Sequence, residues 1–278
     1  MFIATLVAKE RLAAGDISAA CDAVEGRAGA VVAERACDIW FSGNIAEGRS
    51  ALEALPGIDV IVQREAERTR RLLVADMDST MITVECIDEL ADYVGLKAEV
   101  SAVTERAMRG EIDFAVALRN RVALLAGLTE ATVAECLRER VKLMGGAREL
   151  VTAFRAAGGT ALLVSGGFTH FTGPIAAEIG FDRAVANRLI VKDGALTGEV
   201  EHPIVDAQTK RDTLLAEAAA LGIPISATIA IGDGANDIPM IEAAGLGVAY
   251  HAKPRTEAAA DASVRFGDLS VVRYALGL

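Results

Sequence analysis

The stretch LLVADMDST, residues 72–80, is an apolar run that ends abruptly in two carboxylates, Asp76 and Asp78. A continuous run of Leu, Val and Ala is typical of a parallel strand that is buried on both faces. Ligands of open α/β sheets bind beyond the carboxyl ends of such strands, so both carboxylates are expected at the edge of a site. Side chains at i and i+2 share a face of an extended backbone, and two like charges so close need a cation beside them. A divalent cation with oxygen ligands would meet that need.

Two later stretches end in a similar manner. TALLVSGG, residues 160–167, is an apolar strand that ends in a hydroxyl group and two glycines, and ATIAIGDGAND, residues 227–237, ends in an acidic, glycine-rich turn. Lys210 lies between them, in the first turn of a helical stretch at residues 207–221. Taken singly, each feature also fits a solvated strand end or a surface lysine. Their order along the chain favours a single site.

The succession of DMDST, SGG, a lone lysine and GDGAND resembles the haloacid dehalogenase (HAD) superfamily of phosphohydrolases. The resemblance covers about residues 70–278 and implies an α/β fold, a Rossmann-like parallel sheet with a helical cap. It also implies Mg²⁺ as the cofactor, held by the side chain of Asp76, the backbone carbonyl of Asp78 and the side chain of Asp233.

The two aspartates of the first motif can support hydrolysis of a phosphate monoester. Asp76 is expected to be the nucleophile that forms an aspartyl-phosphate. Asp78 is expected to protonate the departing alkoxide and then to activate water. Two carboxylates held in different protonation states can divide these roles.

Neutral and cationic groups are expected around the phosphoryl oxygens. The Ser165 hydroxyl and the Gly166 amide can donate hydrogen bonds there, and a glycine lets the backbone approach closely. Lys210 supplies a compact positive charge, and Asn236 is expected to contact the substrate. Asp237 either serves the metal through water or orients Lys210 from behind.

A long helical insert separates the first two strands. About 80 residues lie between Thr80 and the strand that begins at Thr160, and most of them have helical patterns. The candidate helices are 85–94, 98–108, 114–125 and 130–143, with turns at Gly95, Gly110, Gly127 and Gly145–Gly146. A helical insert over the carboxyl ends of two strands is a lid, which we place at about residues 84–144.

The lid residues resemble those of the phosphoserine phosphatases, in VECIDEL at 84–90 and in Met108, Phe114 and Arg121. This resemblance implies that Glu85 meets the ammonium of the substrate, that Arg121 meets its carboxylate, and that Met108 and Phe114 shield the site. A planar guanidinium suits a carboxylate, and apolar cover strengthens the charge contacts beneath it. The alternative is that Met108 and Phe114 are lid core and Arg121 a solvated residue.

The leading prediction is therefore a Mg²⁺-dependent phosphoserine phosphatase that acts on a small phosphorylated amino acid in the last step of serine synthesis. One alternative is a HAD phosphatase for another small phosphomonoester, such as phosphohomoserine or a sugar phosphate. A phosphotransferase would pass the phosphoryl group to a second alcohol. A ligand-sensing protein with a silent second domain is the alternative of a different class, and intact Asp76, Asp78, Lys210 and Asp233 argue against it.

Residues 1–68 are predicted to form a small α+β module, which resembles the ACT-like module of longer phosphoserine phosphatases. Its expected elements are strands in 2–8, 30–41 and 58–63, the middle one a pair broken near Arg35, and helices in 16–25 and 47–55. Asp16 or Ser18 is the expected helix cap. The charged run REAERTRR, residues 64–71, is taken as the connecting segment, and the phosphatase domain as residues 69–278.

Composition excludes several other classes. A formal net charge of −11 argues against nucleic acid as a partner, and no Walker-type GxxxxGK[ST] loop is present. No apolar run reaches the length of about 18 residues that a membrane helix needs. The start MFIA lacks the pattern of a signal peptide, so a cytoplasmic protein is expected. The four cysteines show no pairing typical of disulfides or zinc sites, and a homodimer is left open.

Overall fold

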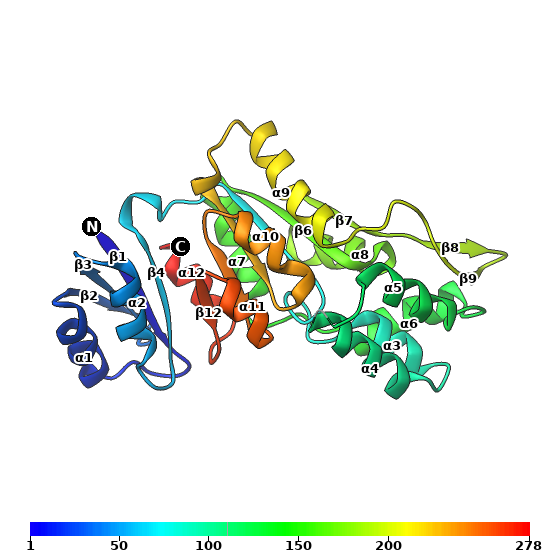
Figure 1. Cartoon of the computed structure of the whole chain (residues 1–278), viewed down its shortest axis with the longest axis horizontal. Helices are drawn as coiled ribbons and strands as arrows, with labels where there is room; N and C mark the ends of the chain where they lie inside the picture. Colours follow the sequence, from blue (N-terminus) through cyan, green and yellow to red (C-terminus); the bar gives the residue numbers. More distant parts are fainter. Residues whose placement is uncertain (110) are drawn as a thin grey trace.

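The computed structural model describes residues 1–109 and 111–278, and the predicted turn glycine Gly110 lies outside the described residues. Three parts lie in a row along the molecule (Figure 1). The amino-terminal module is at one end, a layered α/β core is in the middle, and a group of helices with a two-stranded ribbon is at the other end.

The amino-terminal module has the predicted α+β order. It consists of β1 (Phe2–Ala8), α1 (Ala14–Val24), β2 (Arg27–Val32), β3 (Ala36–Phe41), α2 (Ile45–Glu53) and β4 (Ile58–Arg64). The strands are antiparallel in the order β2-β3-β1-β4, and both helices cover one face over buried Leu6, Ile39 and Leu52. The predicted cap of α1 is wrong. Ala13 is the N-cap, and Asp16 lies inside the first turn, where its carboxylate accepts a hydrogen bond from the Ala13 amide.

The core is the predicted parallel sheet. Its strands are β5 (Leu72–Ala75), β6 (Thr160–Phe168), β7 (Arg183–Asn187), β10 (Thr228–Gly232), β11 (Gly247–Tyr250) and β12 (Ala262–Val264), in the order β12-β11-β10-β5-β6-β7. The central strand β5 is fully buried. Leu73 and Ala75 belong to the hydrophobic cluster on one face, and Leu72 and Val74 to the cluster on the other. Strands β7 and β12 were not predicted.

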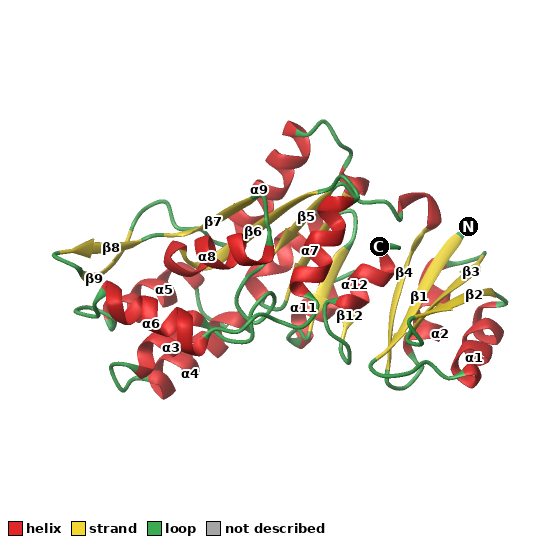
Figure 2. Ribbon diagram, turned by 180° about the vertical axis from the view of Figure 1, so that it is seen from behind, coloured by secondary structure: helices red, strands yellow, loops and turns green. Residues whose placement is uncertain are grey.

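Helices cover both faces of this sheet (Figures 1 and 2). One face carries α7 (Ala147–Ala156), α8 (Thr169–Ile179) and α12 (Ser270–Ala275). The other carries α9 (Ala207–Ala220), α10 (Ile238–Ala243) and α11 (Pro254–Ala259). With apolar cover on both sides, polar groups gather at the ends of the strands, and open α/β sheets bind ligands at the carboxyl ends.

The amino-terminal module is joined to the core by more than its connecting segment. Strand β4 pairs antiparallel with β12, so that one sheet of ten strands runs through both parts. Arg68 binds Asp38 with two hydrogen bonds and also donates to the carbonyls of Tyr274 and Ala275 in α12. The Asp59 carboxylate accepts hydrogen bonds from three successive amides, at residues 265–267. The run 64–71 is therefore part of an interface, and the domain boundary at residue 68 stays a prediction.

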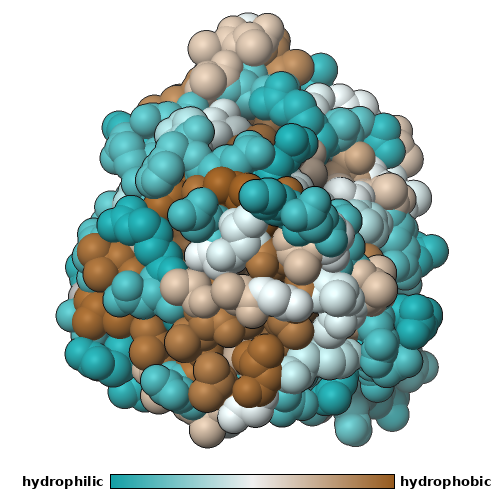
Figure 3. Space-filling view, turned by 90° about the vertical axis from the view of Figure 1, so that its right-hand side faces the viewer, coloured by the Kyte–Doolittle hydropathy of each residue, from teal (hydrophilic) through white to brown (hydrophobic). Residues whose placement is uncertain are grey.

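Four helices inserted between β5 and β6 form the cap: α3 (Cys86–Asp92), α4 (Lys97–Met108), α5 (Phe114–Ala123) and α6 (Glu130–Arg140). Helix α6 ends three residues earlier than predicted. Strands β8 (Leu189–Lys192) and β9 (Ala195–Val200) form a hairpin, and Leu196 exchanges backbone hydrogen bonds with Gly127 and Leu128 of the cap. The hairpin thus supports the cap from outside the sheet. Figure 3 views this end of the molecule and shows hydrophobic side chains gathered on part of its surface.

Candidate active site

Asp76 is the first residue after β5 and is 5% exposed. Its Oδ1 accepts hydrogen bonds from the Met77 amide at 2.8 Å and from Lys210 Nζ at 2.7 Å. Asp76 and Asp78 line one cavity, although the strand ends at Ala75 and the chain then turns. The Asp78 carboxylate accepts from the Cys86 amide at 3.2 Å. Among the charged neighbours of Asp76, Asp237 raises its pKa more than Asp78 does.

Lys210 is fully buried between two carboxylates. Its Nζ lies 2.7 Å from Asp76 and 2.6 Å from Asp237. Asp206 caps α9 by accepting a hydrogen bond from the Thr209 amide, which fixes the helical turn that carries Lys210. Burial lowers the pKa of Lys210, but the two carboxylates outweigh burial and raise it above the ordinary value. The ammonium therefore stays charged.

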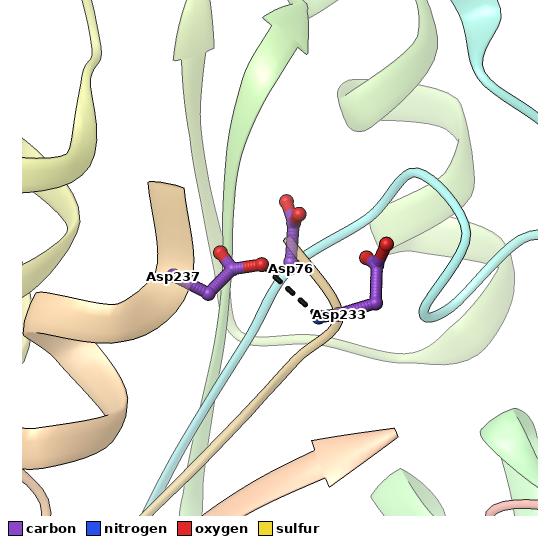
Figure 4. Close-up of side chains that lie close together, drawn as sticks. All are labelled: Asp76, Asp233 and Asp237. Atoms are coloured by element: carbon purple, nitrogen blue, oxygen red, sulfur yellow. Dashed lines mark hydrogen bonds between the residues drawn. The ribbon is translucent and has the colours of Figure 1, made fainter. Parts of the chain in front are cut away.

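The turn after β10 is shaped around Asp237. Its Oδ2 accepts a hydrogen bond from the backbone amide of Asp233 at 3.1 Å (Figure 4) and another from that of Gly234 at 3.0 Å. Its Oδ1 binds Lys210. A Cβ atom on Gly232 would lie 2.4 Å from the Asp237 carboxyl carbon, so this close approach requires glycine. The GDGAND motif is thus a turn in which one carboxylate holds the backbone and the lysine together.

Three buried carboxylates, Asp76, Asp233 and Asp237, bring oxygen atoms within 4.8 Å of one another. Both oxygens of Asp237 already have partners, and Asp233 Oδ1 accepts from the Thr80 hydroxyl at 3.0 Å. In residues 1–109 and 111–278, Asp76 Oδ2 and Asp233 Oδ2 have no hydrogen-bond donor. These two oxygens are therefore free to bind a metal ion.

The charges of this cluster fit a divalent cation. Three carboxylates face one ammonium, which leaves an excess of negative charge in a buried place. Burial and the neighbouring Asp237 raise the pKa of Asp76 to about 7, and burial and Glu85 raise the pKa of Asp233 well above its ordinary value. A hard cation with oxygen ligands would relieve this repulsion and keep both groups ionised.

Ser165 and Gly166 lie in β6, which spans the predicted strand 160–167 and one further residue, Phe168. The Ser165 hydroxyl is buried and accepts a hydrogen bond from the Gly167 amide at 2.9 Å. Sequence reasoning missed Asn187, whose amide group donates to the Gly166 carbonyl at 2.8 Å. Asn187 ends β7, a strand that was not predicted, so nothing in the sequence pattern indicated that Asn187 lies beside the site.

The cap closes over these groups. A cavity of about 20 Å³ lies between cap and sheet, and it is lined by Asp76, Asp78, Glu85, Met108, Phe114, Arg121, Gly166 and Asn236, which were predicted, and by Ile87, Leu118, Gly167 and Phe168, which were not. This volume holds about one water molecule. This cavity is therefore too small to hold a phosphorylated amino acid in the form seen here.

The two predicted head-group residues are each held by a hydroxyl. Glu85 accepts a hydrogen bond from Ser79 at 2.7 Å, and burial and Asp78 raise its pKa to about 8. Arg121 is 2% exposed and donates to Thr104 at 2.8 Å and to the Ala117 carbonyl at 3.1 Å. Ser79 has a positive φ of 55°, a conformation that is uncommon for a residue with a side chain. Neither hydroxyl was predicted.

Residues 73–242 match the family of haloacid dehalogenase-like hydrolases. This chain belongs to that family. It is 50% identical over 204 residues to the phosphoserine phosphatase of Albidiferax ferrireducens. The aligned region covers 72% of this chain and 86% of that protein. The predicted family and fold class are confirmed.

Two solved structures extend the comparison. A probable phosphoserine phosphatase from Vibrio cholerae is 36% identical, with a TM-score of 0.80 over 99% of this chain and 86% of that one. A phospho-aspartyl intermediate analogue of phosphoserine phosphatase is 39% identical, with a TM-score of 0.71 over 74% of this chain and 99% of that one. The first likeness includes the amino-terminal module.

The structure brings the predicted site residues to one place. Eight of them line the cavity, and Ser165 and Lys210 are bonded to Gly167 and Asp76, which also line it. Asp233 and Asp237 bring carboxylate oxygens within 4.8 Å of Asp76. Their individual roles stay predictions.

Proposed function

We infer that this chain is a phosphoserine phosphatase, which hydrolyses O-phospho-L-serine to L-serine and phosphate, the last step of serine biosynthesis. The observation that carries the inference is one cavity in which Asp76 meets Glu85 and Arg121. The first is a nucleophile, and the other two match the charges of an amino-acid head group. The similarity to phosphoserine phosphatases over most of the chain supports it.

Asp76 begins the reaction. Its Oδ1 accepts from Lys210, and one oxygen of the carboxylate attacks phosphorus, so that a bond between the Asp76 carboxylate and phosphorus forms as the bond from phosphorus to the ester oxygen breaks. Asp78, whose pKa burial raises to about 6, gives its proton to that oxygen and releases serine. Asp78 then takes a proton from water, the water attacks phosphorus, and the bond to Asp76 breaks with release of phosphate.

Mg²⁺ is the cofactor that we propose. The free oxygens of Asp76 and Asp233 and the backbone carbonyl of Asp78 would hold it. When bound, it would neutralise charge on the phosphoryl oxygens and favour the ionised form of the carboxylates. Asp237 is proposed to orient Lys210 and the turn, because both of its oxygens are occupied.

The cap supplies the contacts that select the substrate. Glu85 is proposed to meet the ammonium, and Arg121 the carboxylate, as a planar donor. Met108 and Phe114 exclude water, and Ser165, the Gly166 amide, Asn236 and Lys210 are proposed to bind the phosphoryl oxygens. A Cβ on Gly166 would lie 2.6 Å from the Phe114 ring, so the cap packs directly onto this strand.

The test is phosphate release from L-phosphoserine, O-phosphoethanolamine, phosphohomoserine and a sugar phosphate, each with Mg²⁺ and with a chelator. We expect the highest kcat/KM on L-phosphoserine and no turnover without the metal. A higher kcat/KM on the sugar phosphate would overturn the substrate assignment. Transfer of phosphate to an added alcohol in place of water would identify a phosphotransferase.

We also propose the division into residues 1–68 and 69–278, with the cap at about 84–144. No helix in the described ranges, 1–109 and 111–278, is long and apolar enough to cross a membrane. The expectations of no nucleic-acid partner and of a cytoplasmic location stay predictions, and a homodimer is left open.

A further inference from the structure

Three buried polar side chains link three helices of the cap. Asp88 of α3, Thr104 of α4 and Arg121 of α5 are 9%, 3% and 2% exposed. Only Arg121 was expected to have a function. Polar groups this deeply buried are costly unless they are hydrogen-bonded to one another.

Thr104 is the centre of this group. Its hydroxyl lies 2.6 Å from Asp88 Oδ1 and accepts a hydrogen bond from Arg121 Nη1 at 2.8 Å. A hydroxyl has one proton, and the Val100 carbonyl at 3.1 Å competes for it. The hydrogen bond to the charged Asp88 is shorter and therefore stronger than the one to the Val100 carbonyl. The hydroxyl proton thus points to Asp88, and a lone pair of the hydroxyl oxygen faces Arg121.

This arrangement fixes the guanidinium without neutralising it. Nε and Nη1 of Arg121 are bound inside the cap, and in residues 1–109 and 111–278 its Nη2 has no protein acceptor. Arg121 also lines the cavity that contains Glu85 and Asp78. A free arginine there could turn to Glu85 and form an ion pair, which would remove both charges needed by an amino-acid head group.

We propose that Asp88 and Thr104 are positioning residues that hold Arg121 toward the substrate carboxylate and away from Glu85, and so set the preference for a phosphorylated amino acid over a phosphorylated amine. The inference rests on the proposed function. Thr104 acts as the hydrogen-bonded link, and Asp88 fixes the direction of its hydroxyl.

The experiment compares kcat/KM on L-phosphoserine with kcat/KM on O-phosphoethanolamine, which lacks only the carboxylate. Thr104→Val keeps the shape of the side chain and removes its hydroxyl. We expect the ratio of the two values to fall roughly 5- to 15-fold, as for loss of one hydrogen bond. Thr104→Ser should restore the ratio, because it restores the hydroxyl.

Val100→Ala is the matched control. It lies one turn earlier on α4, is fully buried and has no side-chain hydrogen bond, so it loosens the same helix without touching the polar group. We expect a lower melting temperature and an unchanged ratio. Asp88→Asn, which keeps the volume and removes the charge, is the second variant should Thr104→Val fail to fold, and its ratio should fall in the same direction.

The outcomes separate the two inferences. If wild-type protein prefers L-phosphoserine but Thr104→Val and Asp88→Asn keep the wild-type ratio, the positioning role is wrong and the proposed function stands. If Val100→Ala shifts the ratio as much as Thr104→Val, cap stability alone explains it and the positioning role is wrong. If wild-type protein shows no preference for L-phosphoserine, both inferences fail.

Discussion

Two regions meet at the cavity and hold their charges in different ways. In the strand-end cluster, defined as Asp76, Lys210, Asp233 and Asp237, the lysine contacts two of the carboxylates directly, and one of these two, Asp237, also binds backbone amides. In the cap, Glu85 is held by a neutral hydroxyl of Ser79, and Arg121 by that of Thr104.

The difference separates chemistry from selection. The strand-end cluster is built on the buried sheet, and we propose that it acts on the phosphoryl group that all phosphomonoesters share. The cap charges lie on the inserted helices and the segment before them, and we propose that they contact only the head group. A change in the cluster should therefore slow every substrate alike, whereas a change in the cap should alter the ratio between substrates.

Asp76→Asn should have the largest effect. It removes the nucleophile with little change in shape, so we expect turnover to fall by at least about 10⁴-fold on every substrate, while the melting temperature stays close to that of wild-type protein. Phosphate release and circular dichroism measure the two effects. Mass spectrometry must exclude deamidation back to Asp. Appreciable Mg²⁺-dependent turnover by the intact Asp76→Asn protein would contradict the mechanism.

Lys210→Met should have the second-largest effect on activity. It leaves Asp76 and Asp237 buried without their cation, so kcat/KM should fall by about 10²- to 10³-fold. Loss of one partner of a buried ion pair also costs roughly 3–5 kcal/mol of unfolding free energy. Kinetics on L-phosphoserine and O-phosphoethanolamine and denaturant unfolding give both numbers. Unequal losses on the two substrates would contradict the comparison, because Lys210 has no contact with the cap head-group residues.

Arg121→Ala should lower kcat/KM far more on L-phosphoserine than on O-phosphoethanolamine. A hydrogen bond to a charged group contributes about 1.5–3 kcal/mol, so we expect a loss of roughly 10- to 150-fold in kcat/KM on L-phosphoserine. The loss on O-phosphoethanolamine should be far smaller, because that substrate has no carboxylate to bind. The Mg²⁺ requirement should remain. Equal losses on both would assign Arg121 to cap structure.

Without the metal, repulsion among the carboxylates of the strand-end cluster should make the stability of the protein depend on pH. Burial is the largest cause that raises the pKa of Asp76 to about 7, of Asp78 to about 6 and of Glu85 to about 8. The folded protein then binds more protons than the unfolded chain between about pH 4 and pH 8, so its stability falls as the pH rises through that window.

The measurement is the melting temperature in chelator between about pH 5 and pH 8, which should decrease as the pH rises. Added Mg²⁺ should raise it more at the upper end of this range than at the lower. Asp76→Asn is the control, since it removes one titrating group and should flatten the dependence. A melting temperature in chelator that rises with pH would contradict this account of the cluster.

The sequence predicted the strand-end cluster well because its signals are local. Asp76 and Asp233 each follow an apolar run, and such runs identify buried strands. The turn that carries Asp78 was not predicted, because an apolar run does not show where the strand ends. Strand β12 has only three residues, too few for a pattern, although it joins the amino-terminal module to the core.

The cap was predicted less completely because its polar contacts connect different helices. Thr104 is 17 residues from Arg121 and 16 from Asp88, and no periodicity within one helix indicates that they meet. Asn187 illustrates the same limit, since its partner Gly166 lies 21 residues away on the neighbouring strand. Long-range hydrogen bonds of buried groups depend on the packing of elements, which a pattern along one element does not encode.

The smallest expected effect concerns the one ion pair described here that bridges the two regions. Lys253 donates its backbone N–H to the Asp233 carbonyl at 3.0 Å, and its ammonium lies 2.9 Å from Glu105 on cap helix α4. The two side chains are 35% and 40% exposed. A pair this exposed contributes less than about 1 kcal/mol, so Lys253→Met should lower kcat/KM by no more than about fivefold.

That loss should be equal on both substrates and should shrink at high salt, because the pair favours closure of the cap and touches no part of the substrate. Arg109→Met is the matched control. Arg109 also pairs with Glu105, at 2.9 Å, but it lies on the cap and reaches no core residue, so its loss should leave kcat/KM unchanged. A loss above tenfold, or one that salt does not reduce, would place Lys253 among the groups that act on the substrate. Identical behaviour of the two variants would show that the charge of Glu105, and not its bridge to the core, is what the cap uses.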